Sequence, residues 1–437
     1  MTGARNRELL ALVPAALLLT AGFAALFIER SDVLSNVSLT YGAIFLGLCL
    51  AAHVVLRIAL PHADPYLFPL FAVLACFGLV MIYRIDDDLA REQAQWFVLG
   101  LGLFAATVLL LQDLAVLERY RYTIAAVSLA ILLLPRLPLI GQQVHGAYLG
   151  VKLGPLTFQP AEFAKIGIIV FLASYLRDTR QLLVVGARRF AGITIPPLKH
   201  FGPLLAVWGA AMAMLFVIQD LGSSLMFFGG FLALLYVATN RLSFPAIGLV
   251  LFAAGAWLLY QVRPTITHRV DAWLHPFGSL YDQAGGSYQV AQSLFAQADG
   301  GLFGRGFGQA LLAIPGPAGH QVPLLPAAQT DLIYAVITNE LGLLGACAVI
   351  CTYLLAIQRG FKIATLARDS FSKLLATGLT SVFALQVFVI VGGVTKVIPL
   401  TGVTLPFISY GGSSILANFV LLALLLIISD KARRPAP

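Results

Sequence analysis

The chain has 437 residues, of which 59% are apolar and only 11% are charged. Soluble domains contain roughly 45–50% apolar and about 25% charged residues, so a soluble fold could not hide this much apolar surface. The composition therefore excludes a soluble globular protein and predicts a polytopic membrane protein. We expect the formal net charge of +8 to reflect Lys and Arg in cytoplasmic loops, and we expect no nucleic-acid partner.

Twelve apolar windows are long enough to cross a bilayer, which predicts an all-α bundle of about twelve transmembrane helices. The chain starts with basic and then apolar residues, as a signal peptide does. Its apolar part is long for a signal peptide and no clear cleavage site follows, so we expect a retained first span. The windows lie near residues 9–28, 41–60, 66–83, 95–111, 121–138, 163–176, 203–218, 222–239, 243–260, 331–356, 374–394 and 412–429.

An even number of spans puts both termini on the same side of the membrane. If that side is the cytoplasm, 18 of the 28 Lys and Arg residues lie on it, although the other side has the longest loop. This bias predicts cytoplasmic termini and long outer segments at residues 139–162 and 261–330. The second segment keeps aromatic residues throughout, so we expect it to fold onto the outer membrane face.

The first of four polar stretches at the edges of spans is "FQPAEFAK", residues 158–165. Pro160 suits the first turn of a helix. Gln159, Glu162 and Lys165 follow at steps of three, near one helical face. Two interpretations are open: a Glu–Lys pair that neutralises itself, or a lysine aimed at an anionic head group.

The second polar stretch is "VIQDLGSS", residues 217–224. Asp220 is a lone carboxylate between two closely spaced spans. The simplest role for this carboxylate is to cap the next helix, with Ser223 and Ser224 helping.

The third polar stretch is "PAAQTDLIYAVITNELG", residues 326–342. Thr330 or Asp331 fits the N-cap of the tenth span. Asp331 also fits a catalytic base at an outward cavity, since burial would raise the pKa of its carboxyl group toward a useful range. Both interpretations remain open from the residues alone.

The fourth polar stretch is "VTKVIPLTGVTLPFISYGGSS", residues 394–414, with Lys396 near its start. Pro and Gly break it too often for one helix, yet it is too apolar for a free loop. Irregular backbone at membrane depth is tolerated only where it is buried in protein or lines a cavity. We expect this stretch to form part of a cavity wall, with Lys396 placed to meet an anion.

These stretches, in this order, together with "GGSYQVAQSLFAQADGGLFGRGFGQ" at residues 285–309, resemble the SEDS family of shape, elongation, division and sporulation proteins. The resemblance covers roughly residues 66–430. "IPLTG" at residues 398–402 is more similar to the rod-shape branch than to the division branch. Family members typically have ten spans, so the resemblance implies an extra N-terminal pair at residues 1–60 and a SEDS-like membrane domain at residues 61–437 with outer loop 261–330.

The resemblance implies a peptidoglycan glycosyltransferase that works at the outer face of the bacterial cytoplasmic membrane. A strand on undecaprenyl pyrophosphate would be the donor, and the 4-hydroxyl group of lipid II would attack its anomeric carbon with inversion. The family's essential carboxylate lies in a His-Thr-Asp motif, matched here by Gln329-Thr330-Asp331, so Asp331 is the candidate general base. The resemblance leaves a divalent cation (Mg or Mn) open as a cofactor.

The resemblance also assigns supporting roles to other residues and implies a separate partner, a class B penicillin-binding protein that crosslinks the strands. The candidates for binding substrate or pyrophosphate are Lys165, Glu162, Gln159, Arg269, Lys396 and Thr330. The candidates for lining the cavity or for structure are Asp220, Glu340, Ser409, Tyr410, Gly411, Gly412 and Ser413.

Departures from the family pattern leave two other functions open. Gln329, Ala327 and Asn339 replace residues that are usually charged or His in the family, and "HGAYLG" at residues 145–150 lacks the usual arginines. A lipid II flippase is one alternative, because broken helices also suit transport. A non-catalytic scaffold that activates a partner synthase is the other. The clustering of the notable charges at the outer edge favours surface chemistry over transport.

Overall fold

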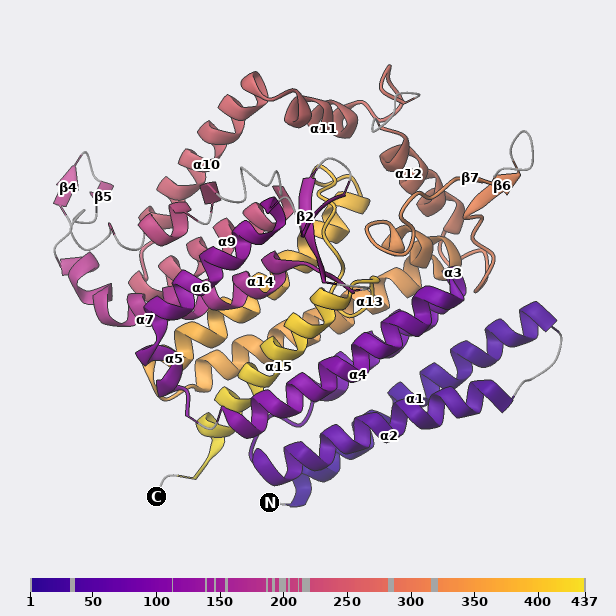
Figure 1. Ribbon diagram of the computed structural model, residues 1–437, viewed down its shortest axis with the longest axis horizontal. Coiled ribbons are helices and arrows are strands. Elements are labelled where there is room, and N and C mark those ends of the chain that lie inside the picture. The colour runs from indigo at the N-terminus through magenta and orange to yellow at the C-terminus, as the bar shows by residue number, and fades with distance from the viewer. Residues whose placement is uncertain are drawn as a thin grey trace.

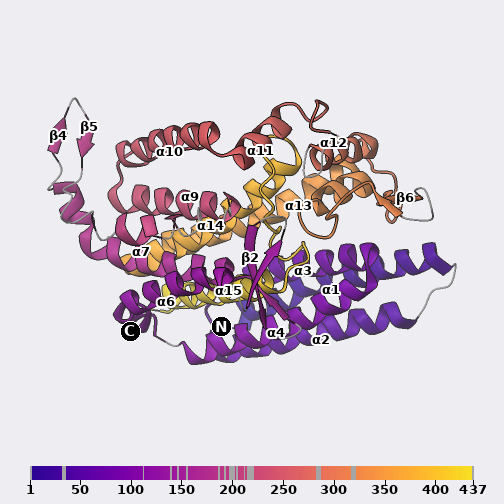
Figure 2. The ribbon, with the colours of Figure 1, turned by 45° about the horizontal axis from the view of Figure 1, so that its top comes forward.

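The computed structural model shows an elongated bundle of long helices with a layer of shorter helices and hairpins over one part (Figures 1 and 2). This architecture confirms the prediction of an all-α polytopic membrane protein, with small hairpins added in the connections. The structure describes residues 2–31, 36–111, 113–137, 140–144, 147–153, 156–185, 188–190, 193–195, 202, 205–210, 212–213, 221–281, 287–315 and 321–435.

The first four helices form one side of the bundle, visible in Figure 2 as two antiparallel pairs. They are α1 (Thr2–Ser31), α2 (Asn36–Ala59), α3 (Leu67–Ile85) and α4 (Asp87–Leu110). The ring of Phe23 lies 4.9 Å from that of Tyr83, and Phe45 stacks on Phe97 at 5.2 Å. A Cβ added to Gly22 would lie 2.8 Å from Val80. The predicted extra pair therefore packs tightly against the rest of the chain.

The remaining elements alternate between long helices and small antiparallel hairpins. In chain order they are α5 (Ala115–Arg119), α6 (Arg121–Leu133), the 3₁₀ helix η1 (Leu134–Arg136), β1 (Gly141–Val144), β2 (Ala147–Leu153), β3 (Leu156–Phe158), α7 (Pro160–Val185), β4 (Arg188–Phe190), β5 (Ile193–Ile195), α9 (Leu221–Thr239), α10 (Ser243–Val262), α11 (Pro264–Leu274), α12 (Tyr288–Gly300), β6 (Ala313–Pro315), β7 (Gln321–Pro323), α13 (Ile333–Leu366), α14 (Ser370–Val394) and α15 (Gly412–Arg433).

Nine helices in the described part of the chain are long and apolar enough to cross a membrane: α1, α2, α3, α4, α9, α10, α13, α14 and α15. Each coincides with one of the twelve predicted windows. The windows at 121–138 and 163–176 fall on α6, which has 13 residues, and on α7, which carries charges at both ends. The window at 203–218 lies largely outside the described residues, so the number twelve stays a prediction.

Helix α13 differs from the single straight span that the sequence predicts at 331–356. It continues to Leu366 and has a kink at Gly342, whose φ is +67°. A Cβ at Gly342 would lie 2.3 Å from the backbone nitrogen of Gly304 and 2.5 Å from the carbonyl oxygen of Leu302. The loop after α12 thus enters the kink, and only glycine leaves room for it.

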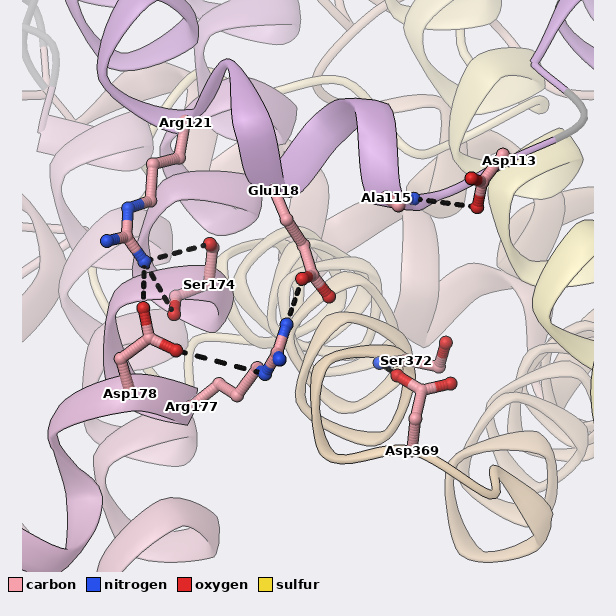
Figure 3. A network of polar contacts seen from close by, with 9 residues as sticks. All are labelled: Asp113, Ala115, Glu118, Arg121, Ser174, Arg177, Asp178, Asp369 and Ser372. Atoms are coloured by element: carbon pink, nitrogen blue, oxygen red, sulfur yellow. Dashed lines mark hydrogen bonds and ion pairs between the residues drawn. The ribbon is translucent and has the colours of Figure 1, made fainter.

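Ion pairs join three elements at the end of the bundle near the C-terminus (Figure 3). Arg177 of α7 pairs with Glu118 of α5, and Arg121 of α6 pairs with Asp178 of α7. The carboxylate of Asp369 accepts a hydrogen bond from the backbone N–H of Ser372 at 2.8 Å and so caps α14. The pair of Arg177 with Glu118 fixes the short helix α5 against α7, and the pair of Arg121 with Asp178 joins α6 to the same part of α7.

Candidate functional site

The irregular segment predicted as a cavity wall is non-helical from Thr395 to Gly411, between α14 and α15. Residues 405–409 are buried, and the hydroxyl of Tyr353 donates a hydrogen bond to the carbonyl of Pro406 at 2.5 Å. A Cβ at Gly78 of α3 would lie 2.4 Å from the carbonyl oxygen of Phe407. The segment is therefore enclosed by protein, as irregular backbone at membrane depth requires. Whether it lines a substrate cavity remains a prediction.

Asp331 lies in a tight turn just before α13, and the predicted role of Thr330 or Asp331 as the helix cap is wrong. The N-cap position belongs to Leu332, without a side-chain cap. The backbone N–H groups of Thr330 and Leu332 both donate to the carbonyl of Ala327, at 3.0 and 3.3 Å. Ala327 has a φ of +56°, an uncommon conformation for a residue with a side chain. The extra turn moves the helix start past Asp331 and leaves its side chain beside the irregular segment.

Ser409 joins the Asp331 turn to the irregular segment. Its hydroxyl donates to the carbonyl of Thr330 at 2.7 Å and accepts the N–H of Leu405 at 2.9 Å. The next residue, Tyr410, donates its backbone N–H to the carbonyl of Gln329 at 2.8 Å. A Cβ added to Gly402 would lie 3.5 Å from Oδ2 of Asp331. The carboxylate therefore faces the irregular segment at Gly402.

Gln93 of α4 holds the same segment from the other side, and the sequence analysis missed it. Its side-chain amide donates to the carbonyl of Ser409 at 3.2 Å and accepts the N–H of Gly411 at 3.2 Å. The side chain is buried, and its partners are backbone atoms. The sequence contains no signal for this role, because Gln93 stands among the polar residues that open α4, such as Glu92 and Gln95. Trp96, further along α4, also lies against the segment's end, since its ring would meet a Cβ on Gly412 at 2.2 Å.

Tyr410 and Glu92 form a second contact between the segment and α4. The phenol hydroxyl of Tyr410 donates to the carboxylate of Glu92. Burial and this neighbouring carboxylate raise the pKa of the Tyr410 phenol above its usual value. Tyr410 is therefore a neutral hydrogen-bond donor in the physiological range.

Glu162 and Lys165 form the predicted pair near the start of α7, and the pair is buried. Nζ of Lys165 lies 2.6 Å from Glu162 Oε2 and 2.7 Å from Gln386 Oε1. Gln386 of α14 donates in turn to the carbonyl of Thr404 at 3.0 Å. The lysine is only 2% exposed. It therefore supports the irregular segment through Gln386, and its charge is compensated by Glu162.

Two further contacts bring the other predicted stretches to the segment. The backbone N–H of Gln159 donates to the hydroxyl of Ser413 at 2.8 Å. A Cβ on Gly222, in the first turn of α9, would lie 2.0 Å from the side chain of Val403. Asp220 itself lies outside the described residues.

Arg269 and Lys396 lie on elements that meet at the start of the segment. The indole N–H of Trp273, one turn after Arg269 on α11, donates to the carbonyl of Lys396 at 3.0 Å. Lys396 has a φ of +61°. Within the described part of the chain, the side chains of Arg269 and Lys396 make no ion pair. Two basic groups are thus held close to the irregular segment without a carboxylate partner.

Glu340 has a different environment from Asp331. Its carboxylate pairs with Arg84 of α3 at 2.7 Å and accepts the N–H of Gly308 at 3.0 Å. Arg84 also donates to the carbonyls of Gly308 and Ala310, both at 2.6 Å. Glu340 therefore anchors the outer loop onto α3 and α13.

The fourth predicted stretch thus forms the irregular segment, and the other three stretches contact it. Asp331 contributes a carboxylate, Arg269 and Lys396 contribute positive charge, and Ser409, Gln93 and Gln386 hold the backbone between them. Among the described residues, no group of three or more His, Cys, Asp or Glu side chains is arranged to hold a metal ion. A carboxylate such as that of Asp331 suits proton removal, and basic side chains such as those of Arg269 and Lys396 suit an anionic leaving group.

Comparison with known protein families places most of the chain in one of them. The model of the FtsW, RodA and SpoVE family, described as cell cycle protein, matches residues 65–434. The matched region begins after α2.

Curated relatives match over most of their length. Peptidoglycan glycosyltransferase RodA of Mycobacterium tuberculosis is 41% identical over 99% of this chain and 92% of its own length. Stage V sporulation protein E of Bacillus subtilis is 29% identical over 83% of this chain and 95% of its own. The mycobacterial match extends over α1 and α2, whereas the match to the sporulation protein covers a smaller share of the chain.

Solved structures share the fold. A chain from a peptidoglycan synthase complex, studied for the coordination of polymerization and crosslinking, has a TM-score of 0.67 and 25% identity, covering 85% of this chain and 99% of that one. The rod shape determining protein RodA of Thermus thermophilus has a TM-score of 0.59 and 25% identity, covering 86% and 98%.

Proposed function

The chain belongs to the FtsW, RodA and SpoVE family and is a peptidoglycan glycosyltransferase, and we propose that it polymerises lipid II with Asp331 as general base. The observation that carries the assignment of the base is the position of Asp331. Its carboxylate faces Gly402 of the irregular segment, and Ser409 ties the two backbones together. The hydrogen bond from Ser409 fixes the position of the turn that carries this carboxylate.

The reaction joins the incoming lipid II to a strand held on undecaprenyl pyrophosphate. Asp331 takes the proton from the 4-hydroxyl group as its oxygen attacks the anomeric carbon of the donor. The bond from that carbon to the pyrophosphate oxygen breaks, and undecaprenyl pyrophosphate leaves with the electron pair. Attack opposite the leaving group inverts the anomeric centre. A positioned base typically contributes about 10²–10⁴-fold to such a step.

Arg269 and Lys396 are the best placed groups to hold the pyrophosphate. Both lie where α11 meets the start of the irregular segment, and neither is neutralised within the described residues. Lys165 differs, because Glu162 already compensates its charge. We assign Lys165, Glu162 and Gln159 a supporting role beneath the segment, and Thr330 a role in shaping the turn that presents Asp331.

A divalent cation fits this site only together with substrate. Mg²⁺ is commonly held by one or two carboxylates plus substrate phosphates and keeps several waters. Asp331 and the pyrophosphate would supply such ligands, and the ion would neutralise the leaving group. Removal of divalent cations with EDTA should then lower polymerisation, and added Mg²⁺ or Mn²⁺ should restore it. Unchanged activity in EDTA would leave charge neutralisation to Arg269 and Lys396.

The proposed orientation has both termini in the cytoplasm and Asp331 at the outer face of the cytoplasmic membrane. The excess of Lys and Arg in the segments assigned to the cytoplasm supports it. We propose a class B penicillin-binding protein as the crosslinking partner. The structural similarity to a chain of a peptidoglycan synthase complex supports this choice.

Reconstitution in liposomes with lipid II and the partner tests the proposal. The wild-type chain should form glycan strands, and Asp331→Asn should abolish them while keeping the fold. Transfer of lipid II between leaflets without polymer would instead favour a flippase. If glycan strands form only with the partner but form equally well in Asp331→Asn, the chain would instead be a non-catalytic scaffold that activates the partner.

A further inference from the structure

A cavity of about 340 Å³ lies at the end of the bundle that carries both termini, away from Asp331 and its surroundings. Its lining comes from the start of α1, the connection between α2 and α3, and the end of α15. The lining residues are Gly3, Ala4, Arg7, Pro61, His62 and Arg433. Three of these six side chains are basic or can be protonated, and none is acidic. The lining therefore suits an anion.

The acidic side chains near the cavity already have cationic partners. Asp64 accepts from Arg433 and lies 3.7 Å from Arg359. Asp430 pairs with Arg434 at 2.8 Å and accepts the backbone N–H of His62 at 2.8 Å. Among the residues that the structure describes, Asp64 and Asp430 are therefore already engaged and do not compensate further positive charge.

The same holds for the carboxylate of Glu8, one turn into α1. Glu8 pairs with Arg5 at 2.5 Å and with the ring of His53 at 2.7 Å. Arg5 also donates to the carbonyl of Ala63 and so fastens α1 to the connection between α2 and α3. The carboxylate of Glu8 therefore already has basic partners and supplies no free negative charge to the cavity.

Two arginines remain uncompensated. Arg7 lines the cavity, and Arg57 lies in the last turn of α2. Both are exposed, and neither makes an ion pair within the described residues. His62 adds a ring whose two nitrogens have no hydrogen-bond partner in the described part of the chain, its Nδ1 being 3.7 Å from Asp430. The N-terminal N–H groups of α1 lie at the same place and favour an anion further.

The position of the cavity identifies the kind of anion. Two membrane-spanning helices, α1 and α15, have an end at the cavity, and α2 ends two residues before Pro61, so the cavity opens at the membrane surface. Leu10 on α1 and Ile58 on α2 are 70% and 75% exposed, and such apolar side chains near the end of a span lie beside acyl chains. Basic residues at this level attract anionic lipids by about 1 kcal/mol each.

We propose that this cavity, defined by Gly3, Ala4, Arg7, Pro61, His62 and Arg433, binds the phosphate group of an anionic phospholipid. Arg7 contacts the phosphate directly, and Arg57 attracts it from the last turn of α2. Arg433 contributes charge while it remains paired with Asp64. The bound lipid joins α1 and α2 to the end of α15. The proposal is independent of the role of Asp331.

Native mass spectrometry of the purified full chain with phosphatidylglycerol tests the site. Arg7→Gln should weaken binding about tenfold, because it removes a charge-assisted hydrogen bond to the phosphate in addition to one basic charge. Arg7→Lys should keep most of the binding. Arg119→Gln is the matched control. Arg119 is an exposed arginine on α5, and residues of α5 line a second cavity together with Lys431, near the C-terminal end of α15. The control removes no contact to the phosphate, so it should weaken binding clearly less than Arg7→Gln does.

Three outcomes would overturn the proposal. Equal losses in Arg7→Gln and Arg119→Gln would mean diffuse attraction to the whole basic surface. Equal binding of phosphatidylglycerol and phosphatidylcholine to the wild type would remove the selectivity for anionic lipid. Displacement of the lipid by millimolar inorganic phosphate would assign the cavity to a soluble anion. Unfolding of each variant in lipid-free detergent, measured in parallel, should match the wild type.

Discussion

The hydroxyl of Ser409 donates a hydrogen bond to the carbonyl of Thr330 at 2.7 Å, although 79 residues separate them. Thr330 is the neighbour of Asp331, so this bond sets the position of the proposed base relative to the irregular segment. Gln93 holds Ser409 in turn through its carbonyl. The chain of contacts runs from α4 to the segment and then to the turn before α13.

We expect Asp331→Asn to lower kcat for glycan polymerisation by about 10²–10⁴-fold, because the amide cannot accept the proton. The fold should be preserved, since the side chain has nearly the same shape. Polymer length on gels and the initial rate with labelled lipid II measure the effect. Glu92→Gln is a control that alters another carboxylate beside the segment without removing the base. Wild-type rates in Asp331→Asn would refute the assignment.

We expect Gln93→Leu to lower kcat more than it raises KM for lipid II. The substitution removes two hydrogen bonds to the backbone of Ser409 and Gly411 and leaves those groups buried, at a cost of about 1–3 kcal/mol each. Gln93→Glu keeps one acceptor and should recover part of the rate. A proportional loss of folded protein and activity, with kcat per folded molecule unchanged, would show that Gln93 serves stability alone.

We expect Arg84→Met to destabilise the protein by about 3–5 kcal/mol, because it leaves Glu340 buried and unpaired. The double variant Arg84→Met, Glu340→Met should be less destabilised than Arg84→Met, because no buried charge remains. Thermal unfolding in detergent measures both. Arg91→Met is the matched control, since Arg91 forms an exposed pair with Asp88 and such pairs contribute about 0–1 kcal/mol. Additive effects of the two substitutions would contradict direct pairing.

We expect Gly342→Ala to be strongly destabilising. The residue has a φ of +67°, and its new methyl group would lie 2.3 Å from the backbone of Gly304. The clash can be relieved only if the loop after α12 moves out of the kink of α13. Gly345→Ala in the same helix is a useful comparison, because its methyl group would meet only the side chain of Leu341, at 2.2 Å. Proteolysis of the loop should accelerate in the first variant and much less in the second.

The sequence predicted the helical bundle and the polar stretches well, because apolar windows of bilayer length and charges at their ends are local features. The pairing of Glu162 with Lys165 was one of two interpretations that their spacing left open, and the structure shows this pair. The helix cap at Asp331 was wrong because a left-handed Ala327 adds a turn. Nothing near Ala327 in the sequence demands that conformation.

Gln93 and Gly342 could not be assigned from the sequence because their partners are distant backbone atoms. Gln93 contacts residues more than 300 positions away, and Gly342 makes room for Leu302 and Gly304. Backbone partners leave no pattern of residue types to recognise. These contacts can be recognised only once the packing of the whole bundle is known.

The outer loop holds the end of α14 at two carbonyl groups that lie two residues apart in the sequence. Ser293 and Gln297 of α12 both donate to the carbonyl of Val394 at 2.9 Å, and Trp273 of α11 donates to that of Lys396 at 3.0 Å. The irregular segment begins there and ends at Ser409 and Gly411, beside the base. Any displacement of this loop would therefore be transmitted to the first residues of the irregular segment through three hydrogen bonds to backbone carbonyls.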